Sequence, residues 1–216
     1  MRTVLRNSVA AAVLLCGACA TTQQHGPSAE EETNARLGGD AVVVLPLQAM
    51  SPTAAPAMAA ELAAVRWQAL RESFNDTLRN AFTVRGIAET WIWPSDLRQA
   101  HRRNPALVPN PYELAVGSLR GMRLEPEVDL PERLAEQLRT LLAVSEGRRY
   151  FLLPVGIVLS HGAAGFATSG QVILVDGRRH RVLWARRMTG PASSTAEGAL
   201  SAYAGAIATL FMDVGQ

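Results

Sequence analysis

Residues 150–185 read YFLLPVGIVLSHGAAGFATSGQVILVDGRRHRVLWA, and this stretch decides the fold. Its first run, residues 150–159, is apolar at successive positions, which is typical of a strand buried on both faces in the middle of a sheet. Two further runs rich in β-branched residues, 171–176 and 181–185, flank a short turn that opens with Asp176-Gly177, a hairpin signal. The stretch therefore predicts a sheet and places its centre.

A second buried strand is expected near the start of the domain, at residues 40–48. Its Val42-Val43-Val44-Leu45 run is apolar on both faces, and Pro46 must end or bulge the pairing because proline donates no ladder hydrogen bond. The same Leu-Pro pair recurs at Leu153-Pro154 in a similar apolar run. This echo predicts that the two segments are neighbouring strands.

The remaining elements follow from periodicity. Apolar residues at helical spacing predict helices over 55–82, 95–102, 131–147 and 196–212, and alternation predicts a strand over 84–93. Residues 104–131 form a proline-rich segment that we expect to be an irregular insertion with a helical turn or two near residues 112–116. Together these elements predict a mixed α/β (α+β) fold: one domain over residues 40–216, with helices packed on a mixed sheet of about four to five strands.

Charge separates some classes of partner. The 216 residues include 21 basic and 19 acidic side chains, for a formal net charge of +2. Removal of residues 1–18 would remove Arg2 and Arg6 and leave 19 basic against 19 acidic residues. A neutral mature chain argues against a nucleic-acid partner, because nucleic-acid-binding domains usually carry a clear basic excess.

The N-terminus has the order of a secretory signal. Arg2 and Arg6 are followed by a short apolar core at residues 8–15, too short to span a bilayer, and then by small residues. The segment Leu14-Leu15-Cys16-Gly17-Ala18-Cys19 resembles the lipobox of bacterial lipoprotein precursors. In that family a cysteine after small residues is acylated and becomes the first residue of the mature chain. The resemblance implies a signal peptide over 1–18 and lipidation at Cys19; Cys16 is the competing site, and a plain secretory cleavage near Ala20 is the third option.

The same resemblance implies a location. Ala20, where an aspartate would favour the inner membrane, implies the outer membrane, with acyl chains in the lipid bilayer and the domain facing the periplasm. The polar residues 19–39 are expected to be a flexible tether. No cysteine follows Cys19, so the domain is expected to hold no disulfide.

The order of elements also resembles the lipoprotein domains of the CsgG, LpoB and TolB N-terminal type. Two short pieces carry the resemblance, Ile173-Leu174-Val175-Asp176-Gly177 and Val182-Leu183-Trp184, and the proline-rich segment 104–131 departs from it. Members of that group are not enzymes: they form secretion pores, activate peptidoglycan synthases or bridge envelope complexes. The resemblance therefore implies no catalytic residue and no cofactor, a protein partner in the envelope, and a possible oligomer.

Three arginines and two tryptophans are the candidate contact residues. Arg178, Arg179 and Arg181 belong to the only dense basic cluster, which could meet lipid phosphate or an acidic partner, or could simply keep a hairpin tip soluble. Trp91 and Trp93 fall on one face of an expected strand, where they could stack on cell-wall sugars or pack in the core.

Catalytic and metal sites have little support in the sequence. No His-Glu-x-x-His string occurs, and no histidine pairs with a cysteine, so no metal site is expected. Ser160-His161 could belong to a hydrolase, but no Gly-x-Ser-x-Gly elbow is present. Residues 160–170, rich in Gly, Ala and Ser, are interpreted as a loop that could be a mobile contact segment.

Three functions remain open on the sequence. The first is a non-catalytic envelope lipoprotein that binds or helps assemble another envelope component. The second is a small hydrolase that acts on peptidoglycan or lipid through Ser160 and His161. The third is a subunit of an oligomeric secretion or envelope complex.

Overall fold

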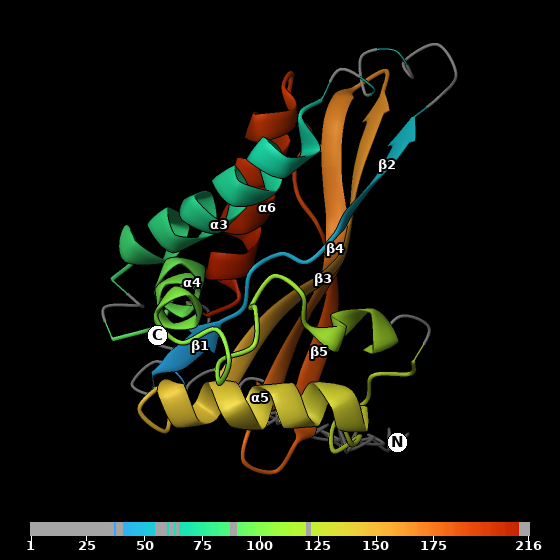
Figure 1. Ribbon diagram of the computed structural model, residues 1–216. Coiled ribbons are helices and arrows are strands. Elements are labelled where there is room, and N and C mark those ends of the chain that lie inside the picture. Colours follow the sequence, from blue (N-terminus) through green and yellow to red (C-terminus); the bar gives the residue numbers. More distant parts are fainter. Residues whose placement is uncertain are drawn as a thin grey trace, which may run out of the picture.

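The computed structural model describes residues 37, 41–54, 60, 63, 65–86, 90–119 and 122–211. The signal peptide, Cys16, Cys19 and the tether up to residue 36 lie outside the described residues. The elements are β1 (Val42–Val44), β2 (Met50–Ala54), α3 (Trp67–Thr83), α4 (Pro94–Arg103), the 3₁₀ helix η2 (Ala115–Leu119), α5 (Glu132–Val144), β3 (Tyr150–Gly162), β4 (Gly165–Asp176), β5 (Arg181–Thr189) and α6 (Ala196–Thr209). The predicted fold class is confirmed: one domain with a mixed five-stranded sheet and helices packed on it (Figure 1).

Strand β3 is the centre of the sheet, as its apolar sequence predicts. It pairs in parallel with β1 (Val42 opposite Tyr150) and, further along the same edge, with β2 (Met50 opposite Ile157). Its other edge pairs with β4 in an antiparallel hairpin, and β4 pairs with β5. Val44 pairs with Leu152, and the two Leu-Pro pairs are the next residues of the two segments. The prediction that these segments are neighbouring strands is therefore confirmed.

A bulge divides β3 into two halves. The register with β4 shifts between Val155 and Val158, where Gly156 has a φ of +60°, a conformation that suits glycine. On the opposite edge, residues 45–49 leave the ladder between β1 and β2. Both edges of β3 therefore change register at the same level, and the upper half of the sheet extends as an arm beyond the lower half (Figure 1).

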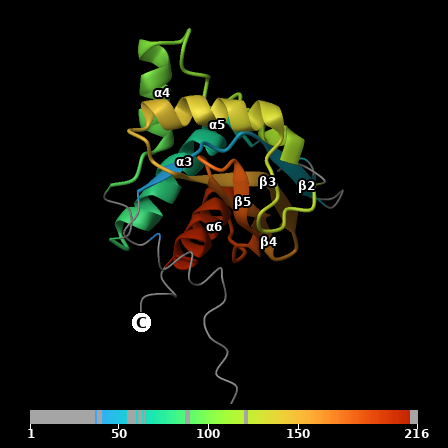
Figure 2. The ribbon, with the colours of Figure 1, turned by 90° about the horizontal axis from the view of Figure 1, so that it is seen from below.

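Helices cover the two faces of the sheet unequally. Helices α3 and α6 lie on one face, and α5 and η2 lie on the other, as the view from below shows (Figure 2). The first layer buries Phe74, Trp184 and Tyr203, and the second buries Leu138 and Phe151. The alternation of β3 and β4 sends successive side chains to the two layers, so both faces of the lower sheet are apolar.

Side chains of α3 hold the break between β1 and β2. The amide oxygen of Asn75, a buried residue, accepts a hydrogen bond from the backbone N–H of Leu47 at 3.1 Å. Arg71 donates to the backbone carbonyl of Gln48 at 2.7 Å. The Gln48 amide in turn donates to the carbonyl of Pro111 at 2.7 Å and accepts from the N–H of Leu114 at 3.1 Å. These bonds satisfy backbone groups that the ladder leaves free, and they fix the segment around Pro111 against α3.

Three expectations about elements are wrong in part. The helix expected over 55–82 is interrupted: residues 60 and 63 are helical, residues 65–66 are not, and α3 begins at Trp67. Met58 and Leu62 lie outside the described residues. Residues 50–54, which precede the expected helix, pair with β3 as strand β2. The strand expected over 84–93 is reduced, among its described residues, to a single bridge between Ile92 and Val43. The loop expected over 160–170 is a hairpin, with a tight turn only at 163–164.

The proline-rich segment is more ordered than its composition suggests. Besides η2, residues 127–130 run beside β5: the N–H of Glu127 donates to Val182 at 2.8 Å, and the N–H of Leu130 donates to His180 at 2.8 Å. The segment therefore protects the lower edge of β5, which would otherwise expose unpaired backbone groups.

Candidate contact surface

The two candidate tryptophans belong to the core. Trp91 and Trp93 are only 6% and 3% exposed. They pack with Phe82 at centroid distances of 4.8 and 6.0 Å, and Trp91 also meets Phe211 at 5.6 Å. Neither ring can offer a face to a sugar or a partner, so the core-packing alternative describes both residues, and their assignment to a contact surface is wrong.

A buried ion pair organises the turn between β4 and β5. The carboxylate of Asp176 is fully buried and accepts hydrogen bonds from Nε of Arg149 at 2.9 Å and from the N–H groups of Arg178 and Arg179 at 2.9 and 3.1 Å. Burial alone would raise the pKa of Asp176, but the Arg149 guanidinium and these N–H groups hold its pKa below the ordinary value. Asp176 is thus an ionised residue that shapes the turn.

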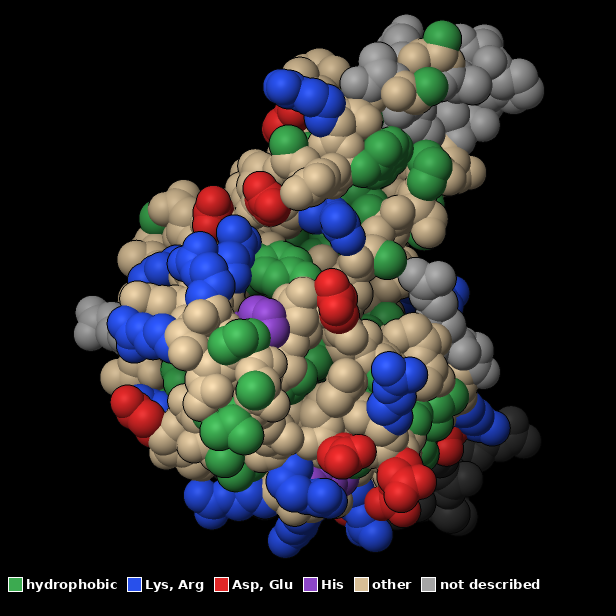
Figure 3. Space-filling model, viewed as in Figure 1, with side chains coloured by type: hydrophobic (Ala, Val, Ile, Leu, Met, Phe, Trp, Pro, Cys, Tyr) green, Lys and Arg blue, Asp and Glu red, His purple; other side chains and the backbone are tan. Residues whose placement is uncertain are grey.

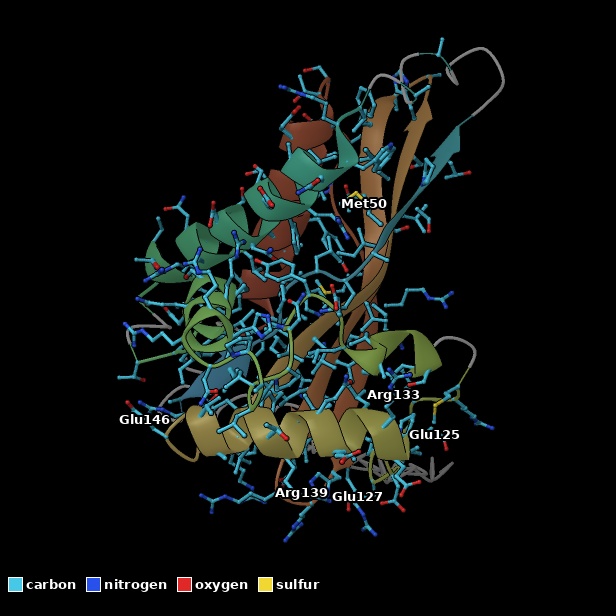
Figure 4. The ribbon with its side chains drawn as sticks, viewed as in Figure 1. Met50, Glu125, Glu127, Arg133, Arg139 and Glu146 are labelled. Atoms are coloured by element: carbon cyan, nitrogen blue, oxygen red, sulfur yellow. The ribbon has the colours of Figure 1, made fainter. Side chains whose placement is uncertain are left out.

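The basic cluster is largely compensated by acids of this chain. Arg181 lies 2.9 Å from Asp129 and 3.2 Å from Glu127, and its hydrogen bonds to Asp129 and Glu127 raise its pKa. Arg178 donates to the carbonyl of Gly147, and Arg179 lies 3.9 Å from Asp176. Glu127 lies at the end of the molecule opposite Met50 of β2 (Figure 4). Of the predicted arginines, Arg178 and Arg179 keep exposed side chains. Among the described residues Arg178 has no acid within ion-pair distance, and Arg179 reaches only the buried Asp176, at 3.9 Å.

Ser160 and His161 do not form a catalytic pair. They are consecutive in β3, so their side chains point to opposite faces of the sheet. The hydroxyl of Ser160 donates to the carbonyl of Ala167 at 3.1 Å, and the ring of His161, 8% exposed, stacks on Phe166 with centroids 4.0 Å apart. The geometry lacks the hydrogen bond between nucleophile and base that serine catalysis requires.

The described residues offer neither a metal cluster nor a membrane-spanning helix. Within the described ranges, no group of three or more His, Cys, Asp and Glu side chains could hold a metal ion. None of the helices that the structure describes is both long and apolar enough to cross a bilayer.

One face of the arm is not covered by any helix that the structure describes. Beyond Gly156, one side of β2, β3 and β4 faces away from α3 and α6 (Figure 1). Most of its side chains are small or carry a hydroxyl group, and all are exposed or half-buried. We call this surface the open face; it consists of Ser51, Thr53, Val158, Ser160, Ala167, Ser169 and Gln171. At its base, a hollow of about 610 Å³ is bordered by Val155, Leu119, Met122 and Arg187.

The edge of the arm is also free. Among the described residues, β2 pairs only with β3, so its outer backbone edge has no partner strand, and Pro52 interrupts the donors along it. This surface was not predicted from the sequence, because the Gly, Ala and Ser residues of 160–170 indicate a loop. The available signal was the alternation of small polar residues with Phe166, Thr168 and Gly170, which is typical of a strand with one packed face.

Comparison with known proteins gives distant structural neighbours. No protein-family model and no curated protein matches the sequence. Among solved structures, the chain is similar to the LpoB C-terminal domain from Salmonella enterica, at 16% identity and a TM-score of 0.37 over 70% of this chain and 82% of that one. It is also similar to the PelC dodecamer from Paraburkholderia phytofirmans (16%, 0.34, 82% and 88%) and to lipoprotein GNA1162 from Neisseria meningitidis (13%, 0.36, 82% and 99%). These neighbours include bacterial lipoprotein domains, but the TM-scores are below 0.5, so the argument for function rests on the residues of this chain.

Proposed function

We propose that this chain is a periplasm-facing lipoprotein of the outer membrane, acylated at Cys19, which acts by binding or assembling another protein of the cell envelope without catalysis. The observation that carries the proposal is the N-terminal order of Arg2 and Arg6, an apolar core, and the lipobox-like residues 14–19. Ala20 supports sorting to the outer membrane, and residues 19–36 are long enough to act as a tether between the bilayer and the domain. The tether expected over 19–39 is shorter than predicted, because Leu37 is helical and buried in the core of the domain.

The open face of the arm is the surface we assign to the partner. It is a flat sheet face with hydroxyl groups, it borders the free edge of β2, and no described helix packs on it. Protein partners commonly recognise an exposed sheet edge by main-chain hydrogen bonds and the neighbouring side chains by fit. The exposed Arg178 and Arg179 lie at the other end of the sheet and are a secondary contact candidate.

Acylation is tested by substitution of the two cysteines. Cys19→Ala should abolish incorporation of labelled palmitate and release the protein from the outer-membrane fraction, whereas Cys16→Ala should leave both unchanged. Retention of label and of membrane association in Cys19→Ala, with loss of both in Cys16→Ala, would move the anchor to Cys16. Loss in neither variant would refute the lipoprotein assignment.

The contact surface is tested by site-specific photo-crosslinking in cells. A photoreactive residue at Ser169 or Thr53 should give one defined adduct with an envelope protein, and the same residue at Arg139, on the solvent side of α5, should not (Figure 4). Adducts of equal yield from all three positions would count against a specific surface. Adducts with a second copy of this chain, together with an oligomer in light scattering, would favour the oligomeric-subunit alternative.

A further inference from the structure

A second, smaller cavity shares no lining residue with the open face. It has a volume of about 340 Å³ and is bordered by α3, α4 and the segment before η2. Its lining residues are Gln68, Arg71, Glu72, Arg98, His101, Asn110 and Tyr112. Lys and Arg side chains gather over α3 and α4 in this part of the surface (Figure 3). The volume falls at the lower end of the range of ligand sites, so it suits a small molecule or the end of a peptide.

Two half-buried arginines border this cavity, and neither forms an ion pair with a carboxylate of the described residues. Arg71 is held through its bond to the Gln48 carbonyl at 2.7 Å. Arg98 lies over the ring of Tyr112, 4.8 Å from its centroid, and donates to the Tyr112 hydroxyl. Among the described residues no carboxylate lies within ion-pair distance of Arg71 or Arg98, in contrast to Arg149 and Arg181. The bond to Tyr112 and, more weakly, the charges of Glu72 and Asp76 raise the pKa of Arg98, so this cation is partly compensated without an ion pair. Two fixed guanidiniums in one cavity are the arrangement that binds an anion.

Three other polar groups of the cavity can contribute to binding. Nδ1 of His101 lies 2.8 Å from the carbonyl oxygen of Val108 and must donate to it, because a carbonyl can only accept, so Nε2 is the ring atom left for a ligand. Nε of Arg98 is buried without a hydrogen-bond partner among the described residues, which leaves the charge of that guanidinium incompletely satisfied. The exposed Glu72 supplies one negative charge at the rim.

We propose that this cavity binds a small ligand that carries a carboxylate and a protonated amine, such as a free amino acid or a short peptide with free ends. The carboxylate lies against Arg71 and Arg98, the amine lies toward Glu72, and the aliphatic part lies against the ring of Tyr112. Guanidinium groups recognise a carboxylate by paired hydrogen bonds, and a carboxylate at the rim recognises an ammonium group. The site is built on the folded domain, so it is independent of acylation at Cys19.

Calorimetric titration of the purified full-length protein in detergent tests this assignment with dialanine as the probe. Dialanine should bind saturably with a dissociation constant of about 1 mM or tighter. Dialanine amide, which lacks the carboxylate, should bind at least about tenfold more weakly. No saturable binding, equal binding of the amide, or equal binding of inorganic phosphate would overturn the assignment.

Three substitutions place the ligand in the cavity. Arg98→Lys keeps the charge but removes the planar fork, and it should weaken dialanine binding about tenfold. Glu72→Gln, on an exposed side chain whose loss leaves the fold unchanged, should weaken binding of dialanine but not of N-acetyl-dialanine, which lacks the amine. Arg139→Ala on α5 is the matched control and should bind dialanine like the wild type. A loss in Arg139→Ala equal to that in Arg98→Lys, or no change in either cavity variant, would contradict the proposal.

Discussion

The pair of Asp176 with Arg149 offers the sharpest test of how the turn between β4 and β5 is held. Asp176→Asn preserves the shape of the side chain, and its oxygen can still accept from the N–H groups of Arg178 and Arg179. The new amide group, however, turns a donor toward the guanidinium of Arg149, which bonds to Oδ2 at 2.9 Å through Nε. The substitution therefore breaks an ion pair without creating a cavity.

The size of the effect follows from burial. Breaking a buried ion pair by removing one partner costs about 3–5 kcal/mol. The carboxylate is fully buried, but the Arg149 side chain is 38% exposed, so water recovers part of the loss. We expect the free energy of unfolding to fall by about 3 kcal/mol, toward the low end of that range, and the melting temperature to fall by about 6–12 °C.

Urea unfolding, followed by tryptophan fluorescence, measures this loss, because Trp91, Trp93 and Trp184 are all buried in the folded domain. The control is Glu146→Gln, which removes the ion pair between Glu146 and Arg148. These groups are 3.3 Å apart, and the Glu146 side chain is 78% exposed. It should change the free energy of unfolding by less than about 0.5 kcal/mol. A loss for Asp176→Asn no larger than that of the control would refute the argument that this pair organises the turn.

The same pair predicts a pH dependence. The pKa of Asp176 is lowered in the folded protein, because the bonds from Arg149 and the turn N–H groups outweigh the effect of burial. The stabilisation is therefore complete above the pKa of about 3.9 that an aspartate has in the unfolded chain, and it is lost as the pH falls through the folded value. Below about pH 4, stability should decline more steeply in the wild type than in Asp176→Asn. Parallel acid limbs would contradict this.

Two further substitutions test the core. Gly190→Ala would place a methyl group 2.8 Å from the backbone nitrogen of Tyr203, and it should lower the free energy of unfolding by about 3 kcal/mol in the same urea assay. Gly117→Ala, with no atom within 4 Å of the added carbon, should be close to neutral. Equal effects of the two substitutions would mean that α6 can shift to accommodate the methyl group. Trp91→Ala should cost about 3–5 kcal/mol because it empties a buried position against Phe82, and a loss below about 1 kcal/mol would restore a surface role for the ring.

The apolar runs and the turn residues of the sequence correctly predicted the central strands and the turn between β4 and β5. The run 150–159 is apolar at successive positions, and it is the central strand; the Leu-Pro echo marked two strands that do lie side by side. The turn at Asp176-Gly177 was also predicted, but the bond from Arg149 that fixes it was not, because that pairing joins residues 27 positions apart. The start of α5 was predicted to within one residue, since the helix expected from Pro131 begins at Glu132 with Pro131 as its N-cap, but its expected end at Gly147 lies three residues beyond Val144.

Tertiary contacts decided what the sequence could not. Met50–Ala54 is a strand only because β3 offers a free edge at that level, and its composition gives no strand signal of its own. Gly170 lies within strand β4, where a Cβ atom would come within 2.8 Å of the Tyr203 hydroxyl. This glycine is therefore explained by the close packing of Tyr203 against the strand and not by a loop. The cavity with Arg71 and Arg98 was missed because its residues come from three separate segments.

The order of strands along the chain sets the order in which they can assemble. β3, β4 and β5 are joined by short turns, so this meander can form as soon as it emerges, whereas β1 and β2 precede their partner by about a hundred residues. Until those two segments arrive, one whole flank of β3 offers its hydrogen-bonding groups to any extended chain nearby. A protein delivered unfolded across a membrane would pass through this intermediate, in which one edge of β3 is unpaired. The time for which that edge stays exposed would depend on how fast the long loop between β2 and β3 closes.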